Sequence, residues 1–169
     1  MTRTSAPPLT RRGLMTAGAL LAVLAAALPA TLPTAARADE ASALAFLEAL
    51  YAPYRAGGMG IDRTDAAVMG RIFTPELAAM IADDDARAAA DGEVPNLDAD
   101  PFIDAQDGEI GDIAVTVADA PGGRMLGRAS FTNSGEPKIV ELVLEETPAG
   151  WRVDDIHWPE GTLRGLYSH

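Results

Sequence analysis

The chain has 169 residues, a formal net charge of −12 and no cysteine. The absence of cysteine excludes disulfides, a thiol nucleophile, thiolate metal sites and a lipid-modified cysteine at the mature N-terminus. The acidic balance argues against binding to nucleic acid or to an anionic membrane, because both require a basic surface.

The first 38 residues have the organisation of a secretory signal peptide. Arg11 and Arg12 precede an apolar run over residues 17–28, and the segment ends in "ARA", with the small residues Ala36 and Ala38. A basic start, a short apolar middle and small residues at the cleavage position are typical of such a signal. The paired arginines indicate the twin-arginine pathway. An uncleaved membrane anchor is disfavoured, because a spanning helix needs about 20 apolar residues and prolines interrupt this run earlier.

Cleavage after Ala38 would leave residues 39–169 as a single exported domain. The removed segment holds four of the 13 basic residues and none of the 25 acidic ones, so the mature chain has nine bases, 25 acids and a net charge of −16. This charge suits a soluble protein, in the periplasm or secreted, that meets cations or a basic protein. A chain of this length suffices for one domain that buries about two-thirds of its unfolded surface.

Apolar residues recur at helical spacing in the first half of the mature chain. The sequence "EASALAFLEALYAPYR" (40–55) has one apolar stripe and predicts the first helix. A second, short helix is expected to start near Thr64. Thr74 suits the N-cap of a third helix and Gly92 its end. Three consecutive aspartates, residues 83–85, lie in the middle of this helix and are expected on a solvated face.

An acidic loop, "DADPFIDAQDGEIGD" (98–112), separates the helices from the strands. Its residues indicate a structural connector: the Asp100 carboxylate can accept a backbone N–H two residues further on, and a proline follows it to fix the turn. Phe102 and Ile103 are expected to pack under the sheet. Gln106 is expected to hydrogen-bond buried backbone where the loop crosses the end of the sheet.

A cation site is the alternative interpretation of this loop. Calcium takes six to eight oxygen ligands, and Asp100, Asp104 and Asp107 are the candidate ligands. The EF-hand pattern fails, because Phe102 occupies the third ligand position if Asp98 is the first. With Gln106, these three aspartates are also the candidate residues of the loop for binding a ligand.

After the loop the period of apolar residues changes to two, which predicts strands. Four segments joined by short Gly/Pro turns predict an antiparallel meander: "DIAVTVAD" (112–119), "RMLGRASFTN" (124–133), "KIVELVLEET" (138–147) and "WRVDDIHW" (151–158). About three N-terminal helices packed on one face of this four-stranded sheet make an α+β domain.

The last of these segments, "WRVDDIHW", contains the other concentration of candidate residues. Trp151 has the opposite parity to the apolar residues at the end of the segment, which predicts either a bulge near Asp154 and Asp155 or a strand covered on both faces. Asp155 and His157 share a parity, so an Asp–His pair is the candidate for proton transfer or for ligating a metal. Trp151 and Asp154 are candidate ligand-binding residues, and both Trp151 and Trp158 are expected in the core or at the rim of a cavity between helices and sheet.

Four short motifs occur in the order "FLEALYAPY", "FTPELAAMI", "DADPFIDAQD" and "WRVDDI". In these, the chain resembles a bacterial family of small exported proteins catalogued as domain of unknown function 3828, over most of residues 43–166. The resemblance implies an NTF2-like or cystatin-like α+β fold. Some members look like immunity proteins against secreted cell-wall amidases. Many members are lipoproteins with a mature N-terminal cysteine, from which this chain departs.

Two classes of function remain open. The first is a non-catalytic binding module, of which an inhibitor-like or immunity-like protein is one kind, that engages a small ligand or a basic protein. The alternative is an NTF2-like cavity enzyme that uses Asp155 and His157. The sequence has no G-x-S-x-G or H-E-x-x-H motif, and two histidines cannot form a three-histidine zinc site, so neither a cofactor nor a bound metal is expected. The lack of a recognisable nucleophile favours the binding module.

Overall fold

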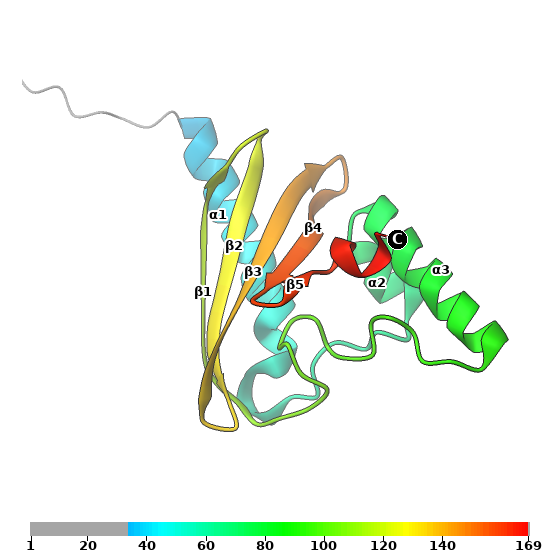
Figure 1. The fold of residues 1–169 in the computed structure, drawn as a ribbon. Coiled ribbons are helices and arrows are strands. Elements are labelled where there is room, and N and C mark those ends of the chain that lie inside the picture. Colours follow the sequence, from blue (N-terminus) through cyan, green and yellow to red (C-terminus); the bar gives the residue numbers. More distant parts are fainter. Residues whose placement is uncertain (1–33, 169) are drawn as a thin grey trace, which may run out of the picture. The chain divides into compact units, whose positions relative to one another are not determined.

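The computed structural model describes residues 34–168 of the chain (Figure 1). Arg11 and Arg12 lie outside the described residues, whereas Ala36 and Ala38 fall within the range of the first helix, α1 (Thr34–Tyr51). The cleavage after Ala38 therefore stays a prediction. Within residues 34–168, no helix combines the length and the apolar character needed to cross a membrane.

Five strands form one antiparallel sheet in the order β1-β2-β3-β4-β5. Their bounds are β1 Ile110–Ala120, β2 Arg124–Asn133, β3 Glu136–Thr147, β4 Gly150–Trp158 and β5 Gly161–Thr162. The predicted α+β class and meander are confirmed, and the predicted count of four strands is corrected by the addition of β5. Because β5 has only two residues, it carries no alternating pattern that the sequence could reveal.

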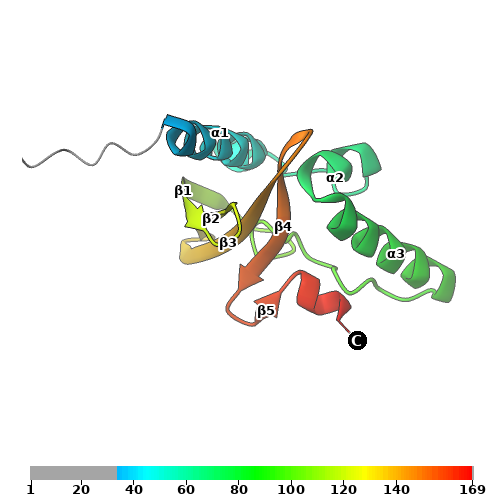
Figure 2. The ribbon, with the colours of Figure 1, turned by 90° about the horizontal axis from the view of Figure 1, so that it is seen from above.

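Helix α1 covers the inner face of the sheet (Figure 2). It changes at Tyr51 into a short 3-10 helix, η1 (Ala52–Gly57), because Pro53 cannot continue an α-helix. Ala43 and Leu47 on its apolar stripe are fully buried. The helix approaches β2 closely at Gly127, where a Cβ atom would lie 3.0 Å from a methyl carbon of Leu47. A larger residue at this position would therefore push the Leu47 side chain away from the sheet.

Helix α2 (Ala66–Ile72) lies beside β4 (Figure 2). It begins two residues later than Thr64, because the Asp65 carboxylate accepts the backbone N–H groups of Ala67 and Val68 as the N-cap. The residue that follows α2, Phe73, forms a parallel bridge with Val153 of β4. The connection between α2 and α3 thus covers the part of the β4 edge that β5 does not reach.

Helix α3 (Pro75–Asp91) begins and ends where the sequence predicts. The Thr74 hydroxyl accepts the N–H of Leu77, and Gly92 adopts a left-handed conformation with φ of 71° after the last turn. The prediction that residues 83–85 form a solvated face is wrong for the middle aspartate. Asp84 is buried, and its carboxylate accepts the backbone N–H of Asn96 at 2.6 Å and the Asn96 side-chain amide at 2.7 Å. It therefore fixes the start of the acidic loop to α3.

The space between the helices and the sheet is filled by aromatic and aliphatic side chains. Phe102 of the acidic loop is fully buried, as predicted, and stacks on Phe73 with 5.7 Å between ring centroids. The Tyr51 hydroxyl donates to the Phe102 carbonyl at 3.0 Å. Ile103 is also buried, as predicted. The loop thus closes one end of the core.

The predicted bulge in β4 is confirmed. The register between β3 and β4 shifts between the pairs Val143–Asp155 and Leu144–Val153, which leaves Asp154 as the extra residue. The shift allows the side chains of both Val153 and Ile156 to be buried in the core.

Candidate functional site

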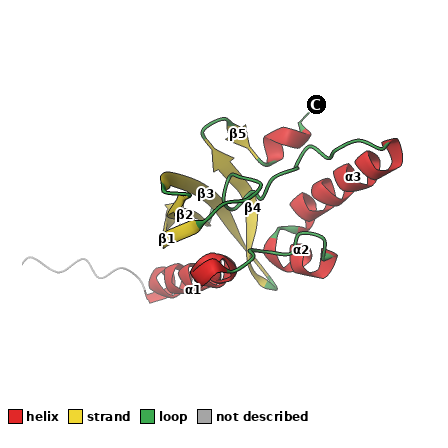
Figure 3. Cartoon of the chain, turned by 90° about the horizontal axis from the view of Figure 1, so that it is seen from below, coloured by secondary structure: helices red, strands yellow, loops and turns green. Residues whose placement is uncertain are grey.

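Trp158, the last residue of β4, borders three hollows in the surface, of about 240, 190 and 340 Å³. Its indole N–H donates to the carbonyl of Pro101 at 2.9 Å, which ties the end of β4 to the acidic loop. Figure 3 shows this loop running from α3 past the C-terminal helix η2 (Arg164–Tyr167) to the end of the sheet. We call the three hollows together the Trp158 site.

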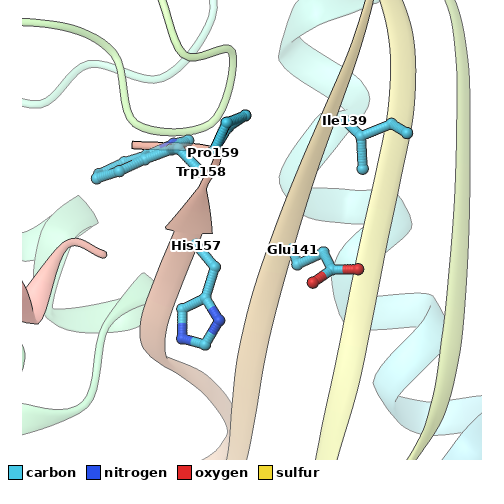
Figure 4. Close-up of a pocket in the computed structure, with 5 residues that line it drawn as sticks. All are labelled: Ile139, Glu141, His157, Trp158 and Pro159. Carbon is cyan, nitrogen blue, oxygen red and sulfur yellow. The ribbon is translucent and has the colours of Figure 1, made fainter. Parts of the chain in front are cut away.

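The first hollow lies over the outer face of β3 and β4 (Figure 4). His157 of β4 and Glu141 of β3 are direct cross-strand partners, and their side chains lie level with each other. Ile139 and Pro159 complete the lining with Trp158. The hollow is therefore an aromatic and apolar surface with one carboxylate and one imidazole.

The predicted Asp155–His157 pair is present beside this hollow. The His157 Nε2 atom lies 3.3 Å from Asp155 Oδ2. The other carboxylate oxygen of Asp155 accepts two backbone N–H groups, from Ile156 and Arg164, each at 2.9 Å. Asp155 is thus held in place by the backbone, and it orients an imidazole whose side chain is 41% exposed.

The second and third hollows have an acidic lining. Asp98, Asp100 and Asp104 are among the residues that line the second hollow, and Asp104 and Glu160 are among those that line the third. Asp104 lines both hollows and has a positive φ of 49°. Its carboxylate already accepts an ammonium group, the Nζ of Lys138, at 2.9 Å. This contact shows the kind of group that the acidic lining attracts.

Asp100 forms the turn cap predicted from the sequence. One carboxylate oxygen accepts the backbone N–H of Phe102 at 2.9 Å, and the other accepts the hydroxyl of Tyr54 at 2.7 Å. Burial raises the pKa of Asp100, although the hydrogen bonds from Tyr54 and Phe102 and the charge of Arg63 act against the rise. Burial, and then the neighbouring charge of Asp100, raise the pKa of Tyr54 far above its ordinary value. Tyr54 is therefore a neutral donor.

Gln106 does not have the contact with buried backbone that the sequence analysis expected, and its neighbour Asp107 lies at the surface. Gln106 is exposed, and its amide donates to the Asp98 carboxylate at 3.4 Å rather than to buried backbone. Asp107 is also exposed, and its backbone carbonyl accepts the Asn133 amide at 3.3 Å. Asn133 packs so closely that a Cβ atom at Gly108 would lie 1.7 Å from its Oδ1 atom, so the position after Asp107 requires glycine.

The three candidate calcium ligands make separate contacts. Asp100 binds Tyr54 and a backbone N–H, Asp104 binds Lys138, and Asp107 points to solvent. Among residues 34–168 there is no group of three or more His, Asp or Glu side chains that could hold a metal ion.

Trp151 and Asp154 have structural contacts away from the three hollows. Trp151 is buried in the core, where its indole N–H donates to the Ser42 hydroxyl of α1 at 2.8 Å. Asp154 is buried, and its carboxylate lies 2.5 Å from Arg164 and 3.3 Å from Arg124. Burial opposes the positive charge of Arg164, but the Asp154 and Glu76 carboxylates raise its pKa overall. Asp154 therefore stabilises the packing of η2 and α3 on the sheet.

The sequence analysis missed three features of the Trp158 site. It placed Trp158 at a cavity rim without recognising that it borders three hollows. It assigned no role to Lys138 or Glu160, because neither belongs to a motif. The only available signal was Trp158 at the end of a strand, beyond the bulge and before a proline.

No family model matches the sequence, and no curated protein matches it. Among solved structures, a phospholipid-binding protein from Ralstonia solanacearum, in complex with a phospholipid, is 24% identical and has a TM-score of 0.30. The match covers 56% of this chain and 49% of that one, so the chain spans about half the length of the solved structure. A similarity of this extent establishes neither a shared fold nor a shared ligand.

Proposed function

We propose that this protein is an exported binding module that holds a positively charged group of a partner protein or small ligand at the Trp158 site. The observation that carries the proposal is the composition of the three hollows. They share one tryptophan and have five acidic residues in their lining, whereas His157 is their single ionisable base within residues 34–168.

Two interactions would hold the cation. An indole ring attracts an ammonium or guanidinium group by about 0.5–1 kcal/mol at an exposed site, and by about 2 kcal/mol where water is excluded. The hydrogen bond from Trp158 to Pro101 fixes the ring before a ligand arrives, so little ordering entropy is lost on binding. The carboxylates of Asp104 and Glu160 supply the opposite charge. The Lys138 contact with Asp104 is an internal example of the same recognition.

The filled core also favours binding at the surface over catalysis in a deep cavity. Phe102, Tyr51 and Phe73 occupy the space between helices and sheet. Each hollow of the Trp158 site is open and has a volume of about 190–340 Å³, at or below the low end of the range for small-molecule sites, which is about 300–1,000 Å³. Such surfaces suit a side chain or a short peptide segment of a partner.

The location of the protein and its family belong to the same proposal. The paired arginines and the "ARA" segment support export to the periplasm or beyond by the twin-arginine pathway. The four ordered motifs support membership of the exported family named above, with an NTF2-like or cystatin-like fold. The mature net charge of −16 supports a basic partner, because it accelerates encounter by long-range attraction.

A titration with hexalysine, followed by isothermal titration calorimetry so that the readout does not depend on Trp158, tests the site. We expect Trp158→Leu to weaken binding about fivefold or more and Asp104→Asn about twofold to fivefold. Asp83→Asn is the matched control, because Asp83 is an exposed acid on α3 outside the three hollows. If Asp83→Asn weakens binding as much as Asp104→Asn, net charge rather than the Trp158 site attracts the peptide.

A second candidate function is proton transfer by Asp155 and His157. The observation that favours it is the contact of 3.3 Å between them, beside the first hollow and with Glu141 opposite. A general base of this kind needs an imidazole held by a carboxylate and open to substrate. Screening the purified protein for hydrolysis of ester and amide substrates tests it. Turnover that His157→Ala abolishes without changing the melting temperature would establish the enzyme in place of the binding module.

A further inference from the structure

The first strand of the sheet, β1, has a neighbour on one side only in the part of the chain that the structure describes (Figure 1). It is 11 residues long and pairs with β2. The opposite edge of the sheet is protected, because β5 is two residues long and the Thr74 N–H donates to the Val153 carbonyl of β4 at 3.0 Å. The two edges therefore differ in how much backbone they leave unpaired.

The direction of the backbone groups in β1 follows from two contacts. The Ser130 hydroxyl of β2 donates to the Ala114 carbonyl at 3.4 Å, so this carbonyl faces β2. Arg55 of η1 donates to the Ile113 carbonyl at 3.1 Å from the other side. Because successive residues of a strand direct their backbone groups to opposite edges, three residues beyond these contacts present both N–H and C=O to the free edge. These residues are Val115, Val117 and Asp119.

This part of β1 lacks the devices that usually block an exposed edge. Lysines, prolines and bulges are common protections of edge strands. The segment "AVTVADA" (114–120) contains neither lysine nor proline, and the irregularity in pairing with β2 lies before it, between Gly111 and Ala114. On the outer face Ala114, Thr116 and Ala118 are small and exposed, so they leave room for the side chains of an added strand.

The charges beside this edge select the occupant. Asp112 and Asp119 are exposed, and neither belongs to an ion pair among residues 34–168. A second copy of the chain would bring the same aspartates and a further net charge of −12 to the contact. Like charges near one another across paired strands are unfavourable, whereas a lysine or arginine there is favourable.

We infer that the free edge of β1, over residues 114–120, binds an extended basic segment of a partner protein as an added antiparallel strand. Main-chain hydrogen bonds to Val115, Val117 and Asp119 would hold the segment, and its basic side chains would pair with the two flanking aspartates. This surface lies at the opposite edge of the sheet from Trp158. Slower exchange of β1 amides therefore reports on this surface and not on the Trp158 site.

Amide hydrogen exchange of the purified full chain provides a direct readout. The probe is a blocked nine-residue peptide of alternating lysine and valine, and the same peptide with glutamate in place of lysine is its control. With the lysine peptide we expect the exchange rate of the Val115, Val117 and Asp119 amides to fall to about one tenth of its value without peptide, or lower. The amides of Thr116 and Ala118 already face β2, so their exchange should not change. The glutamate peptide should give no protection.

Variants test the same contact by affinity. Val117→Pro removes one N–H donor at the free edge and should weaken binding of the lysine peptide by roughly threefold to tenfold. Val117→Ala controls for the lost side chain and should bind like the unmodified chain. Should Val117→Pro fail to fold, the double variant Asp112→Asn, Asp119→Asn provides a second test, because both substitutions are at exposed positions and should leave the fold intact. Loss of the two carboxylates should weaken binding of the lysine peptide by about twofold to tenfold.

Three results would overturn the inference. The first is binding of the lysine peptide without protection of the three amides. The second is equal protection by the glutamate peptide, which would remove the role of charge. The third is protection without any peptide that disappears on dilution, which would identify a second copy of the chain as the occupant.

Discussion

Replacing Asp84 by alanine should release the acidic loop from α3. The Asp84 carboxylate is buried and accepts two hydrogen bonds from Asn96, at 2.6 and 2.7 Å. A third contact, with Arg87 at 3.2 Å, contributes little because the Arg87 side chain is 64% exposed. Hydrogen bonds to a charged group are worth about 1.5–3 kcal/mol each, and removing a buried charge returns part of its desolvation cost. We therefore expect the free energy of unfolding to fall by about 3 kcal/mol.

Urea unfolding followed by tryptophan fluorescence measures this loss. With an m-value of about 1.5–2 kcal/mol/M, the urea midpoint should fall by about 1.5–2 M. Asp83→Ala is the matched control, because Asp83 precedes Asp84 on α3 and is exposed, and it should change stability by less than about 0.5 kcal/mol. Equal midpoints for the two variants would refute the anchoring role of Asp84. Since Asn96 also lines the second hollow, Asp84→Ala should weaken hexalysine binding as well.

Three further predictions concern export, pH and calcium. Changing Arg11 and Arg12 together to lysine should leave the precursor in the cytoplasm, and normal export of this variant in a fractionation experiment would contradict the twin-arginine prediction. Because burial raises the pKa of Asp100 in the folded state, the folded chain binds a proton at Asp100 more tightly than the unfolded chain does. The resulting contribution to stability is present at low pH and is lost as pH rises through the folded pKa. The free energy of unfolding of the unmodified chain, relative to Asp100→Asn, should therefore increase as pH falls from about 7 to about 4; a difference that is constant with pH would argue against a buried, titrating Asp100. Millimolar calcium should shift the melting temperature by less than about 1 °C, and a larger rise that Asp104→Asn removes would show that the loop binds the ion after all.

Local features of the fold were predictable because their causes lie within a few residues. The cap and end of α3 follow from Thr74 and Gly92, whose preferences do not depend on distant parts of the chain. The bulge in β4 follows from a change of parity within eight residues, and the structure places it at Asp154. The turn role of Asp100 likewise depends on the residue two positions away.

The misplaced residues depend on contacts between distant segments. Asp84 lies on the same face of α3 as the buried Leu77 and Ile81, whereas its partner Asn96 follows 12 residues later and supplies the hydrogen bonds that satisfy its carboxylate. Asp154 is engaged by Arg164 of η2 and by Arg124 of β2. No local pattern indicates these partners, because each is a single charge with no periodicity.

The sequence by itself determined the α+β class, the order of helices before strands, and the strong negative charge of the surface. These properties follow from periodicity and composition, which need no knowledge of contacts. Only the tertiary structure decided that Trp158 is the common wall of three hollows. The acidic loop, the end of β4 and the segment after β5 come together there through the hydrogen bond from Trp158 to Pro101, which lies 57 residues earlier in the chain. The edge position of β1, by contrast, follows from the predicted meander, because the first strand of a meander lies at an edge of the sheet.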